Sequence, residues 1–498
     1  MLRKATKSAD VVVVGAGVAG CSAFYGLAKR NRNTAQRGAP SDFKPMLLDA
    51  MSPMSLTSAR GSFQYRNWWP NPGEETMMRL VSRSIDLMDD YAEEIDLNRN
   101  GYLFATRHEA QVAVFRAQAV RHAALGGGSF REHEGSISSY NPSTKAIDRL
   151  DGCDLILGSD SVAEAFPSLA DSGAVAALHV RRAGSLNPFK MGNYQLTKAT
   201  EYCPKAQVLR GKMTDVHATG GRISGITVAM DNGDKHFVAT NRLVLAPGPM
   251  LQQTLDLLMK KNLLAACFPV HHELHARVVF DDPKRIMART APLTFDMDPI
   301  GHLPFGPEEM IENDALAHAV FPGGVHVRPY GDDKALAVWT YDTTFVEPVF
   351  PIQKILDPRY GEICMRGLTR LFPQMSSYLQ DPHVLASIQV AAPPPLAIDA
   401  PKVDGGYYCK MPDNIPLIGA FAESVDGLYF QAAMSGVGLM SSAASGELLA
   451  ATVMGDVQYQ DSATPLPFAS YADALSPNRF QDSSYLESIA GMQTSGQM

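Results

Sequence analysis

The sequence predicts a two-domain protein of mixed α/β plus α+β class, with a Rossmann-type domain joined to a discontinuous, β-rich second domain. A valine run near the N-terminus ends in a glycine-rich turn and is followed at once by a helical pattern. A similar strand, glycine loop and helix return near the C-terminus, and the region between mixes strands with proline-rich loops. At 498 residues the chain also exceeds the size at which one hydrophobic core stops growing.

The bulk composition excludes several classes of protein. Hydrophobic residues make up 45% and charged residues 19% of the chain, which is typical of a globular protein. The formal net charge of −8 argues against a nucleic-acid-binding protein, because such proteins carry a dominant basic patch. No run of about 18 apolar residues lacks a charge or break, so no membrane span is expected. The basic start has no signal-type cleavage site, which favours the cytoplasm and leaves a short organellar address open.

The cysteines do not indicate a metal site. None of them forms a CxxC pair, so the spacing offers neither a zinc site nor a disulfide framework, and we expect no metal and reduced, mostly buried thiols. The six positions are Cys21, Cys153, Cys203, Cys267, Cys364 and Cys409.

The first motif is the glycine-rich turn that follows the valine strand. Gly15 permits a tight turn, Gly17 removes a side chain where a phosphate must approach, and Gly20 lets the helix pack on the strand. Free N–H groups at the start of that helix favour a pyrophosphate. The turn therefore predicts a dinucleotide site built from Gly15, Ala16, Gly17, Val18, Ala19 and Gly20.

An acidic residue ends the second predicted strand, which spans 45–49. Asp49 lies further from the turn than the usual spacing of about 20 residues, because a polar insert at about 31–41 lengthens the crossover. A carboxylate at this position accepts hydrogen bonds from a ribose hydroxyl. Asp49 and the adjacent Ala50 are therefore assigned to the cofactor site.

Further elements follow from periodicity and turn residues. They are a helix from Pro72, a strand at 101–106, a helix at 109–124, a helix opening at Asn187, strands around Gly220–Gly221 and a buried strand at 242–248. The expected division is a nucleotide-binding domain from 8–70, 151–260 and 401–480, helices and a strand of the cap region at 71–150, a substrate domain at 261–400, and a frayed polar tail at 481–498.

Four segments carry a family resemblance. They are the 15–49 unit, the Ser/Gly/Arg-containing stretch 58–69, the Ala246-Pro247-Gly248 strand end, and residues 406–440 with their PDNIPLIG, GLY and SGVG motifs. Together they resemble the superfamily of D-amino-acid oxidase, glycine oxidase and monomeric sarcosine oxidase. The matches fall at both ends and in the middle of the chain, so the resemblance covers its architecture.

The resemblance implies FAD as the cofactor. The cysteine and histidine that attach flavin covalently in some relatives fall here on Gly406 and on Ala59 or Arg60, which implies non-covalent FAD. The helix after the SGVG loop is expected to point its N-terminus at the flavin carbonyl where charge collects on reduction. Further residues implied to bind FAD are Ser58, Ala59, Arg60, Met213, Ala246, Gly248, Gly436, Val437, Gly438, Leu439 and Met440.

The implied activity is oxidation of an amine or amino acid by hydride transfer to flavin N5, with the imine hydrolysing afterwards. Two substrate-binding cations of the family are replaced, one by Tyr408 and the other by Met440. Arg66 or Arg328 is expected to bind a substrate carboxylate instead; otherwise the substrate has none. The lysine used with oxygen in sarcosine oxidase falls near Ala337, so oxygen and another electron acceptor both stay open.

Aromatic residues on alternating segments of the second domain complete the predicted site, among them Tyr330 and Tyr341. The candidate catalytic residues are Arg66, Tyr408, Trp339 and His326. Two other functions stay open, a 2-hydroxy-acid oxidoreductase on the same fold and an assembly protein that binds flavin without turnover. The sequence gives no prediction for the oligomeric state.

Overall fold

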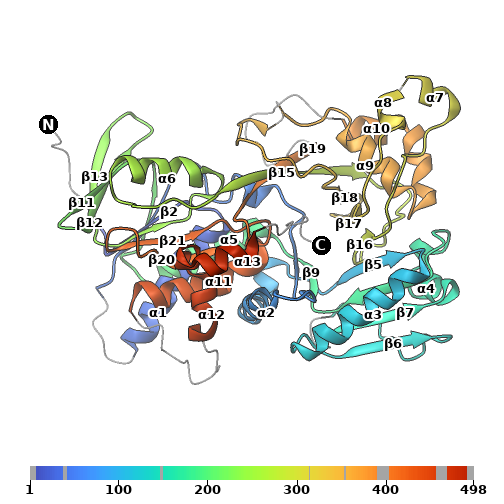
Figure 1. The fold of residues 1–498 in the computed structure, drawn as a ribbon, viewed down its shortest axis with the longest axis horizontal. Helices are drawn as coiled ribbons and strands as arrows, with labels where there is room; N and C mark the ends of the chain where they lie inside the picture. The colour runs from blue at the N-terminus through green and yellow to red at the C-terminus, as the bar shows by residue number, and fades with distance from the viewer. Residues whose placement is uncertain are drawn as a thin grey trace.

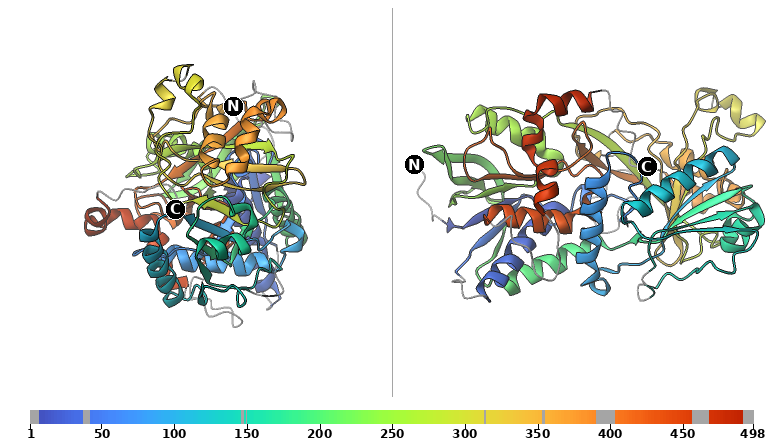
Figure 2. Two further views of the ribbon diagram at one scale, coloured as in Figure 1. Left: turned by 90° about the vertical axis from the view of Figure 1, so that its right-hand side faces the viewer. Right: turned by 60° about the horizontal axis from the view of Figure 1, so that its bottom comes forward.

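The computed structural model describes residues 7–36, 42–145, 148, 150–312, 314–352, 355–389, 403–455 and 468–490. Two large sheets lie toward opposite ends of an elongated molecule (Figures 1 and 2). The predicted mixed α/β class, with a Rossmann-type domain and a β-rich second domain, is confirmed.

The six-stranded sheet is the centre of the Rossmann-type domain. Neighbouring strands are parallel except for the last pair, which is antiparallel. Its order is β10 (Gln207–Arg210), β3 (Pro45–Asp49), β2 (Val11–Val14), β14 (Leu243–Leu245), β21 (Leu428–Ala432) and β20 (Leu417–Ala420).

Both faces of this sheet are covered. Val11 and Val13 pack among the helices, whereas Val12 packs on the opposite side, which is why β2 is apolar throughout. The helical layer consists of α1 (Val18–Ala35), α11 (Gly438–Val453), α5 (Pro188–Tyr202) and α2 (Glu75–Asp89). The other layer consists of α6 (Leu251–Lys260) and a four-stranded sheet of β1 (Lys7–Ser8), β13 (Lys235–Ala239), β12 (Arg222–Ala229) and β11 (Lys212–Thr219).

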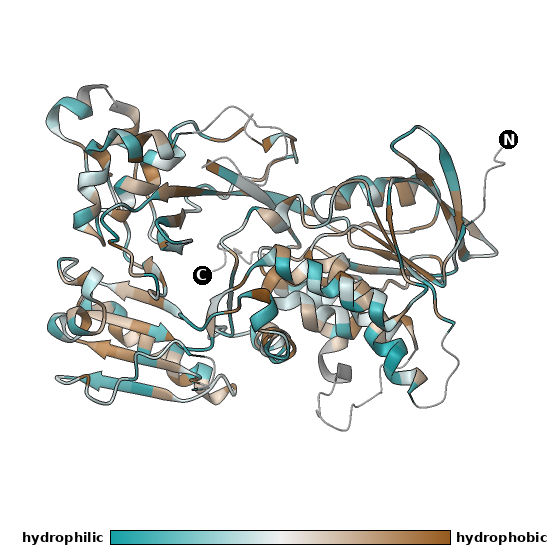
Figure 3. Cartoon of the chain, turned by 180° about the vertical axis from the view of Figure 1, so that it is seen from behind, coloured by the Kyte–Doolittle hydropathy of each residue, from teal (hydrophilic) through white to brown (hydrophobic). Residues whose placement is uncertain are grey.

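A mixed nine-stranded sheet forms the second domain. Its order is β19 (Val403–Lys410), β15 (His271–Asp281), β18 (Lys334–Val338), β17 (His326–Tyr330), β16 (Leu293–Asp296), β5 (Tyr102–Thr106), β8 (Ala176–Val180), β7 (Cys153–Leu157) and β6 (Phe130–Glu134). Helices beside it include α3 (Glu109–Ala124), α4 (Ser159–Ala165), α9 (Tyr360–Leu368) and α10 (Pro382–Ser387). Apolar residues follow the strands of both large sheets, while the helices carry polar and apolar residues (Figure 3).

The remaining elements are short. A small ribbon pairs β4 (Gln64–Arg66) with β9 (Ala183–Ser185). The others are α7 (Pro307–Glu312), α8 (Asp314–Ala317), α12 (Phe468–Leu475), α13 (Ser483–Ile489) and the 3₁₀ turns η1 (Thr57–Ala59), η2 (Glu93–Ile95), η4 (Pro167–Leu169), η5 (Gly248–Met250), η7 (Pro373–Gln380) and η8 (Pro477–Gln481).

Three details differ from the sequence-based expectations. Helix α1 continues to Ala35 where a loop was expected from Asn31, because Asn31 is buried and its side-chain amide donates to Cys203 Sγ at 3.4 Å. The expected tail forms α13 at Ser483–Ile489, capped by Asp482, while 491–498 lies outside the described residues. Strands β7, β8 and β19 belong to the nine-stranded sheet, although the sequence places them with the nucleotide-binding domain.

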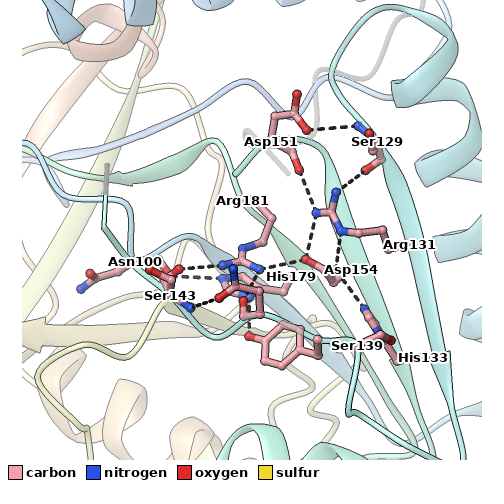
Figure 4. Close-up of polar contacts among 12 residues, drawn as sticks. Asn100, Ser129, Arg131, His133, Ser139, Ser143, Asp151, Asp154, His179 and Arg181 are labelled. Carbon is pink, nitrogen blue, oxygen red and sulfur yellow. Dashed lines mark hydrogen bonds and ion pairs between the residues drawn. The ribbon is translucent and has the colours of Figure 1, made fainter. Parts of the chain in front are cut away.

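A buried charge network lies at the outer end of the nine-stranded sheet (Figure 4). Both carboxylate oxygens of Asp154 accept hydrogen bonds from Arg131, at 2.7 and 3.0 Å. Arg181 donates to the same carboxylate at 3.0 Å, and His133 Nε2 lies 2.9 Å from it. Burial raises the pKa of Asp154, but hydrogen bonds from Arg131 and His133 outweigh burial and lower it to about 2. The carboxylate is therefore charged throughout the neutral range.

Candidate active site

A cavity of about 860 Å³ lies between the six-stranded sheet and the inner end of the nine-stranded sheet. Residues from α1, β4, β15, β17, β19 and α11 all line it. The volume falls within the range of about 300–1,000 Å³ that is usual for ligand pockets. It is therefore the candidate site for both cofactor and substrate.

The glycine turn forms one wall of the cavity, and its three glycines have different tasks. Gly15 has φ +104°, and a Cβ atom there would lie 2.1 Å from the Ala246 carbonyl oxygen. A Cβ at Gly20 would lie 1.6 Å from the Gly15 carbonyl oxygen. The close packing around the turn therefore requires glycine at both positions. Gly17 lines the cavity, and its Cβ would meet only Ser58 Oγ, at 2.9 Å. Gly17 is thus the position where a phosphate can approach the backbone.

Asp49 lies at the end of β3, beside this turn. The Ala16 N–H donates to Asp49 Oδ2 at 2.5 Å, and the Met51 N–H donates to Oδ1 at 2.7 Å. These bonds fix the orientation of the carboxylate. Each oxygen keeps a second lone pair for a ribose hydroxyl.

A second helix N-terminus meets the same cavity. Gly438, Leu439 and Met440, at the start of α11, line it. The preceding loop holds Ala433 at φ +49° and Ser435 at φ +45°, a strained backbone region for residues other than glycine. Helix N-termini favour negative charge, so α1 suits a pyrophosphate and α11 suits a reduced flavin. The residues present therefore fit FAD.

The predicted FAD-binding residues divide into two groups. Those that line the cavity are Gly17, Val18, Ala19, Ser58, Arg60, Ala246, Gly248, Gly436, Gly438, Leu439 and Met440. Those that do not are Gly15, Ala16, Gly20, Asp49, Ala50, Ala59, Val437 and Met213. Met213 packs against the core between β11 and the six-stranded sheet, and Ala59 offers its carbonyl oxygen to Arg277 at 3.1 Å. Of the second group, Gly15, Ala16 and Gly20 shape the glycine turn itself, and Asp49 bonds the Ala16 N–H of that turn.

The position of a covalent flavin link in some relatives is Gly406. A Cβ atom there would lie 3.1 Å from Thr57 Cγ2, so the close approach of β19 to η1 requires a small residue. Cys409 lines the cavity, but burial raises the pKa of its thiol to about 12. A protonated thiol is a poor nucleophile.

Arg66 is the predicted carboxylate-binding cation that lines the cavity. It is 5% exposed, its Nε donates to the Trp68 carbonyl oxygen at 3.3 Å, and its guanidinium lies 5.3 and 5.5 Å from the ring centres of Trp69 and Tyr102. Arg328, the other candidate, donates to the carbonyl oxygens of Ser62 and Pro329, both at 2.9 Å, and does not line the cavity.

Tyr408 and His326 line the same cavity as Arg66. The Tyr408 ring stacks on His275 with centres 3.6 Å apart, and burial raises the pKa of Tyr408 to about 12. His326 stacks on Phe295 at 4.2 Å, and burial lowers its pKa to about 4. Both side chains are therefore neutral at pH 7.

Trp339, a predicted catalytic residue, does not line the cavity. It is 1% exposed and packs in the core against Phe321 and against Tyr341, which does line the cavity. The reason is strand alternation, because Val338 and Thr340 on either side of it line the cavity. Ala337 is likewise a core residue, so the sarcosine-oxidase lysine has no counterpart there.

A polar cluster that the sequence did not predict lies on the cavity wall. Glu273 and His275 alternate along β15 and both face the cavity, with His275 Nε2 3.1 Å from Glu273 Oε2. Lys410, on neighbouring β19, is fully buried and donates to Glu273 Oε1 at 2.9 Å. His275 Nδ1 lies 2.9 Å from Thr340 Oγ1. The spacing of an acid and a histidine two residues apart in a strand was the available signal.

Neither a metal site nor a membrane span is found in the described part of the chain. No group of three or more His, Cys, Asp or Glu residues there is arranged to hold a metal ion. Among the described helices, none combines the length and apolar character needed to cross a bilayer.

Comparison with known proteins places the fold. A family model described as FAD dependent oxidoreductase (DAO) matches residues 10–452. L-proline dehydrogenase from P. horikoshii is 20% identical with a TM-score of 0.63, covering 96% of this chain and 99% of that one. Glycine oxidase from Geobacillus kaustophilus is 16% identical with a TM-score of 0.62, covering 93% of this chain and 98% of that one. Iminodiacetate oxidase from Chelativorans sp. BNC1 is 15% identical with a TM-score of 0.59, covering 90% of this chain and 95% of that one. The search of curated proteins finds no match.

Proposed function

The chain belongs to the family of FAD-dependent oxidoreductases, and from that premise we propose that it oxidises the C–N bond of an amino acid whose carboxylate binds Arg66. One observation carries the proposal. The buried guanidinium of Arg66 lines the same cavity as the two helix N-termini that fit FAD.

The electrostatics around Arg66 support a carboxylate ligand. Its neighbours Tyr102 and Tyr408 stay protonated, because burial raises the pKa of each to about 12. A planar guanidinium in a water-poor site binds a carboxylate through paired hydrogen bonds. Such charge-assisted hydrogen bonds contribute about 1.5–3 kcal/mol each.

The names of the similar structures agree with this class of substrate. Proline, glycine and iminodiacetate are all amines that carry at least one carboxylate.

The protein contributes binding and orientation. When bound, FAD supplies the oxidant that takes a hydride from the carbon beside the substrate nitrogen. Arg66 fixes the carboxylate, which restricts where the neighbouring carbon can lie. The apolar side chains of Leu293, Phe295 and Val338 on the same wall exclude water from the reacting carbon.

Anaerobic reduction of the purified holoprotein tests the proposal. Amino acids should bleach the flavin absorbance, their decarboxylated amines should do so less well, and the imine product should hydrolyse to a carbonyl compound. Bleaching by 2-hydroxy acids alone would replace the proposal with hydroxy-acid oxidation, which Arg66 would also serve. No bleaching by any member of the three classes would favour a flavin-binding protein without turnover.

A further inference from the structure

The polar cluster on the inner end of the nine-stranded sheet forms a continuous chain of hydrogen bonds that ends at the cavity. It runs from Lys410 to Glu273, then to His275, then to Thr340, with successive distances of 2.9, 3.1 and 2.9 Å. Glu273 and Lys410 are 1% and 0% exposed, whereas Thr340 is partly exposed and lines the cavity.

The partners of His275 determine which nitrogen carries its proton. Burial raises the pKa of Glu273, but His275 and Lys410 outweigh burial and lower it, so the carboxylate is charged and can only accept hydrogen bonds. His275 Nε2 must therefore donate to Glu273. In the neutral imidazole Nδ1 is then the acceptor, and the Thr340 hydroxyl donates to it.

The hydroxyl, the imidazole and the carboxylate are thus hydrogen-bonded in series. In this order the hydroxyl can pass its proton to the imidazole, and the carboxylate stabilises the imidazolium that forms. The Tyr408 ring, stacked 3.6 Å from the His275 ring, holds the imidazole in its plane. Burial, together with the charge of Lys410, lowers the pKa of His275 and outweighs the opposing effect of Glu273, so the imidazole is neutral at rest and free to accept a proton. The groups that face His275 are Glu273 on its own strand, Tyr408 and Lys410 on β19, Thr340 after β18 and His326 on β17.

The proposed reaction needs such a group. Loss of a hydride leaves positive charge that the substrate nitrogen must share, and only an uncharged amine has the lone pair to do so. Amines in solution near neutral pH are mostly protonated, with pKa values of about 8–10. One proton must therefore leave the ammonium group before the carbon is oxidised.

We propose that Thr340, His275 and Glu273 form a proton relay that deprotonates the substrate ammonium group, with the Thr340 hydroxyl as the group that contacts the nitrogen. The inference rests on the proposed oxidation of an amino acid. As an ammonium N–H bond breaks, its electron pair stays on nitrogen and its proton passes to Thr340 Oγ. The hydroxyl proton of Thr340 moves at the same time to His275 Nδ1, giving an imidazolium held against the Glu273 carboxylate.

The positions of Arg66 and the relay suit the two ends of one amino acid. Tyr408 interacts electrostatically with both Arg66 and Glu273, and His326 with both Arg66 and His275, so the two groups share neighbours on one wall. Arg66 and Thr340 both line the cavity, so one amino acid within it has a cation for its carboxylate and a hydroxyl for its amine. Lys410 acts as a positioning residue, because its charge keeps Glu273 ionised and so keeps His275 in the accepting tautomer.

Rapid-mixing measurements on the anaerobic holoprotein test the relay through its pH profile. We expect Thr340→Val to slow flavin reduction by about 100-fold at pH 7, the usual size of an acid–base contribution. Above the pKa of the free amine, at about pH 10, the deficit should nearly vanish because the substrate arrives deprotonated. Thr340→Ser, which retains the hydroxyl, should recover most of the rate that Thr340→Val loses at pH 7. The matched control is Thr344→Val on the same loop, whose exposed hydroxyl bonds Asp342 and does not line the cavity.

His275→Gln provides a second variant, since glutamine can form hydrogen bonds but cannot take up the proton; it should show the same pH-dependent deficit. A deficit in Thr340→Val that is equal at all pH values would overturn the relay and leave only a packing role. If amino acids reduce the unmodified protein and both variants keep its profile, the relay is wrong while the proposed oxidation stands. If no amine or amino acid reduces the unmodified protein, both proposals fail together.

Discussion

Two buried carboxylates on the nine-stranded sheet have similar partners and different surroundings. Asp154, at the outer end, is bound by two arginines and a histidine, and Glu273, at the inner end, by a lysine and a histidine. Both are about 1% exposed. Each is charged because its cationic partner offsets the cost of burial.

The two networks differ in where their last group lies. From Asp154 the bonds continue through Arg181 to the carbonyl oxygens of Asn141 and Ser143, both at 2.7 Å, so they end on backbone and secure a loop (Figure 4). From Glu273 they continue to a hydroxyl on the cavity wall. A buried charge is thus not by itself a sign of catalysis. The position of the terminal group separates a network that supports the fold from one that can serve chemistry.

Gly17→Val should have the largest effect, because it should abolish FAD binding at the cavity and leave the Asp154 network intact. The branched side chain would occupy the space where the pyrophosphate approaches, so we expect FAD occupancy to fall to near zero while the outer network persists. The ratio of flavin to protein absorbance measures this. Gly17→Ala should lose less, because its Cβ meets only the Ser58 hydroxyl. A soluble Gly17→Val protein with normal flavin content would contradict the cofactor assignment.

Asp154→Ala should lower the free energy of unfolding by about 3–5 kcal/mol, because Arg181 would remain buried without its carboxylate. Urea unfolding monitored by circular dichroism measures the loss. Asp151→Ala is the matched control; Asp151 is exposed, so its removal should cost no more than about 0.5 kcal/mol. The folded Asp154→Ala protein should still reduce its flavin at the normal rate. A slower chemical step would show that the outer network also serves the reaction.

Arg66→Ala should raise the apparent KM for an amino acid by about 10- to 100-fold, each factor of ten being about 1.4 kcal/mol. Arg66→Lys should recover part of this, since a point charge cannot reproduce the planar fork. The decarboxylated amine serves as the control substrate and should be affected much less. If that amine already matches the acid in the unmodified protein, Arg66 binds no carboxylate.

Trp339→Phe should give the smallest effect. The indole packs in the core, and its N–H donates to the Gly323 carbonyl oxygen at the long distance of 3.4 Å. We expect a loss of stability of about 1 kcal/mol and a change in KM below about twofold. Steady-state kinetics with thermal unfolding tests both. A large change in KM would place Trp339 in substrate binding after all.

The sequence predicts the backbone-built half of the site better than the half built from side chains. Gly15, Gly17 and Gly20 could be interpreted because a glycine turn between strand and helix depends on local spacing alone. The pairing of Glu273 with Lys410 depends on the antiparallel register of β15 and β19, strands about 130 residues apart in the chain, which local patterns do not encode.

The error at Trp339 has the same origin. Its segment was expected to lie near the flavin. Which of its side chains face the cavity changes with a shift of one residue along the strand, and local sequence does not fix that shift. Arg66 lines the cavity, and it could be proposed from the sequence because its segment resembles a known flavin-crossing segment. Arg328 could be excluded only from its contacts with carbonyl oxygens.

The C-terminal elements η8 and α13 have a structural role that their polar sequence does not reveal. Arg479 and Tyr485 both bond the Asp413 carboxylate, each at 2.6 Å, and Arg479 also donates to the Ile415 carbonyl oxygen at 2.7 Å. The neighbouring Asn414 carbonyl oxygen accepts from Ser435 Oγ at 3.2 Å, in the strained loop before α11. Residues 477–490 therefore hold the 413–415 loop, which is bonded in turn to the loop before α11 at the cavity. We expect a chain truncated before Pro477 to lose FAD before it loses its fold. Purification tags are therefore better placed at the N-terminus.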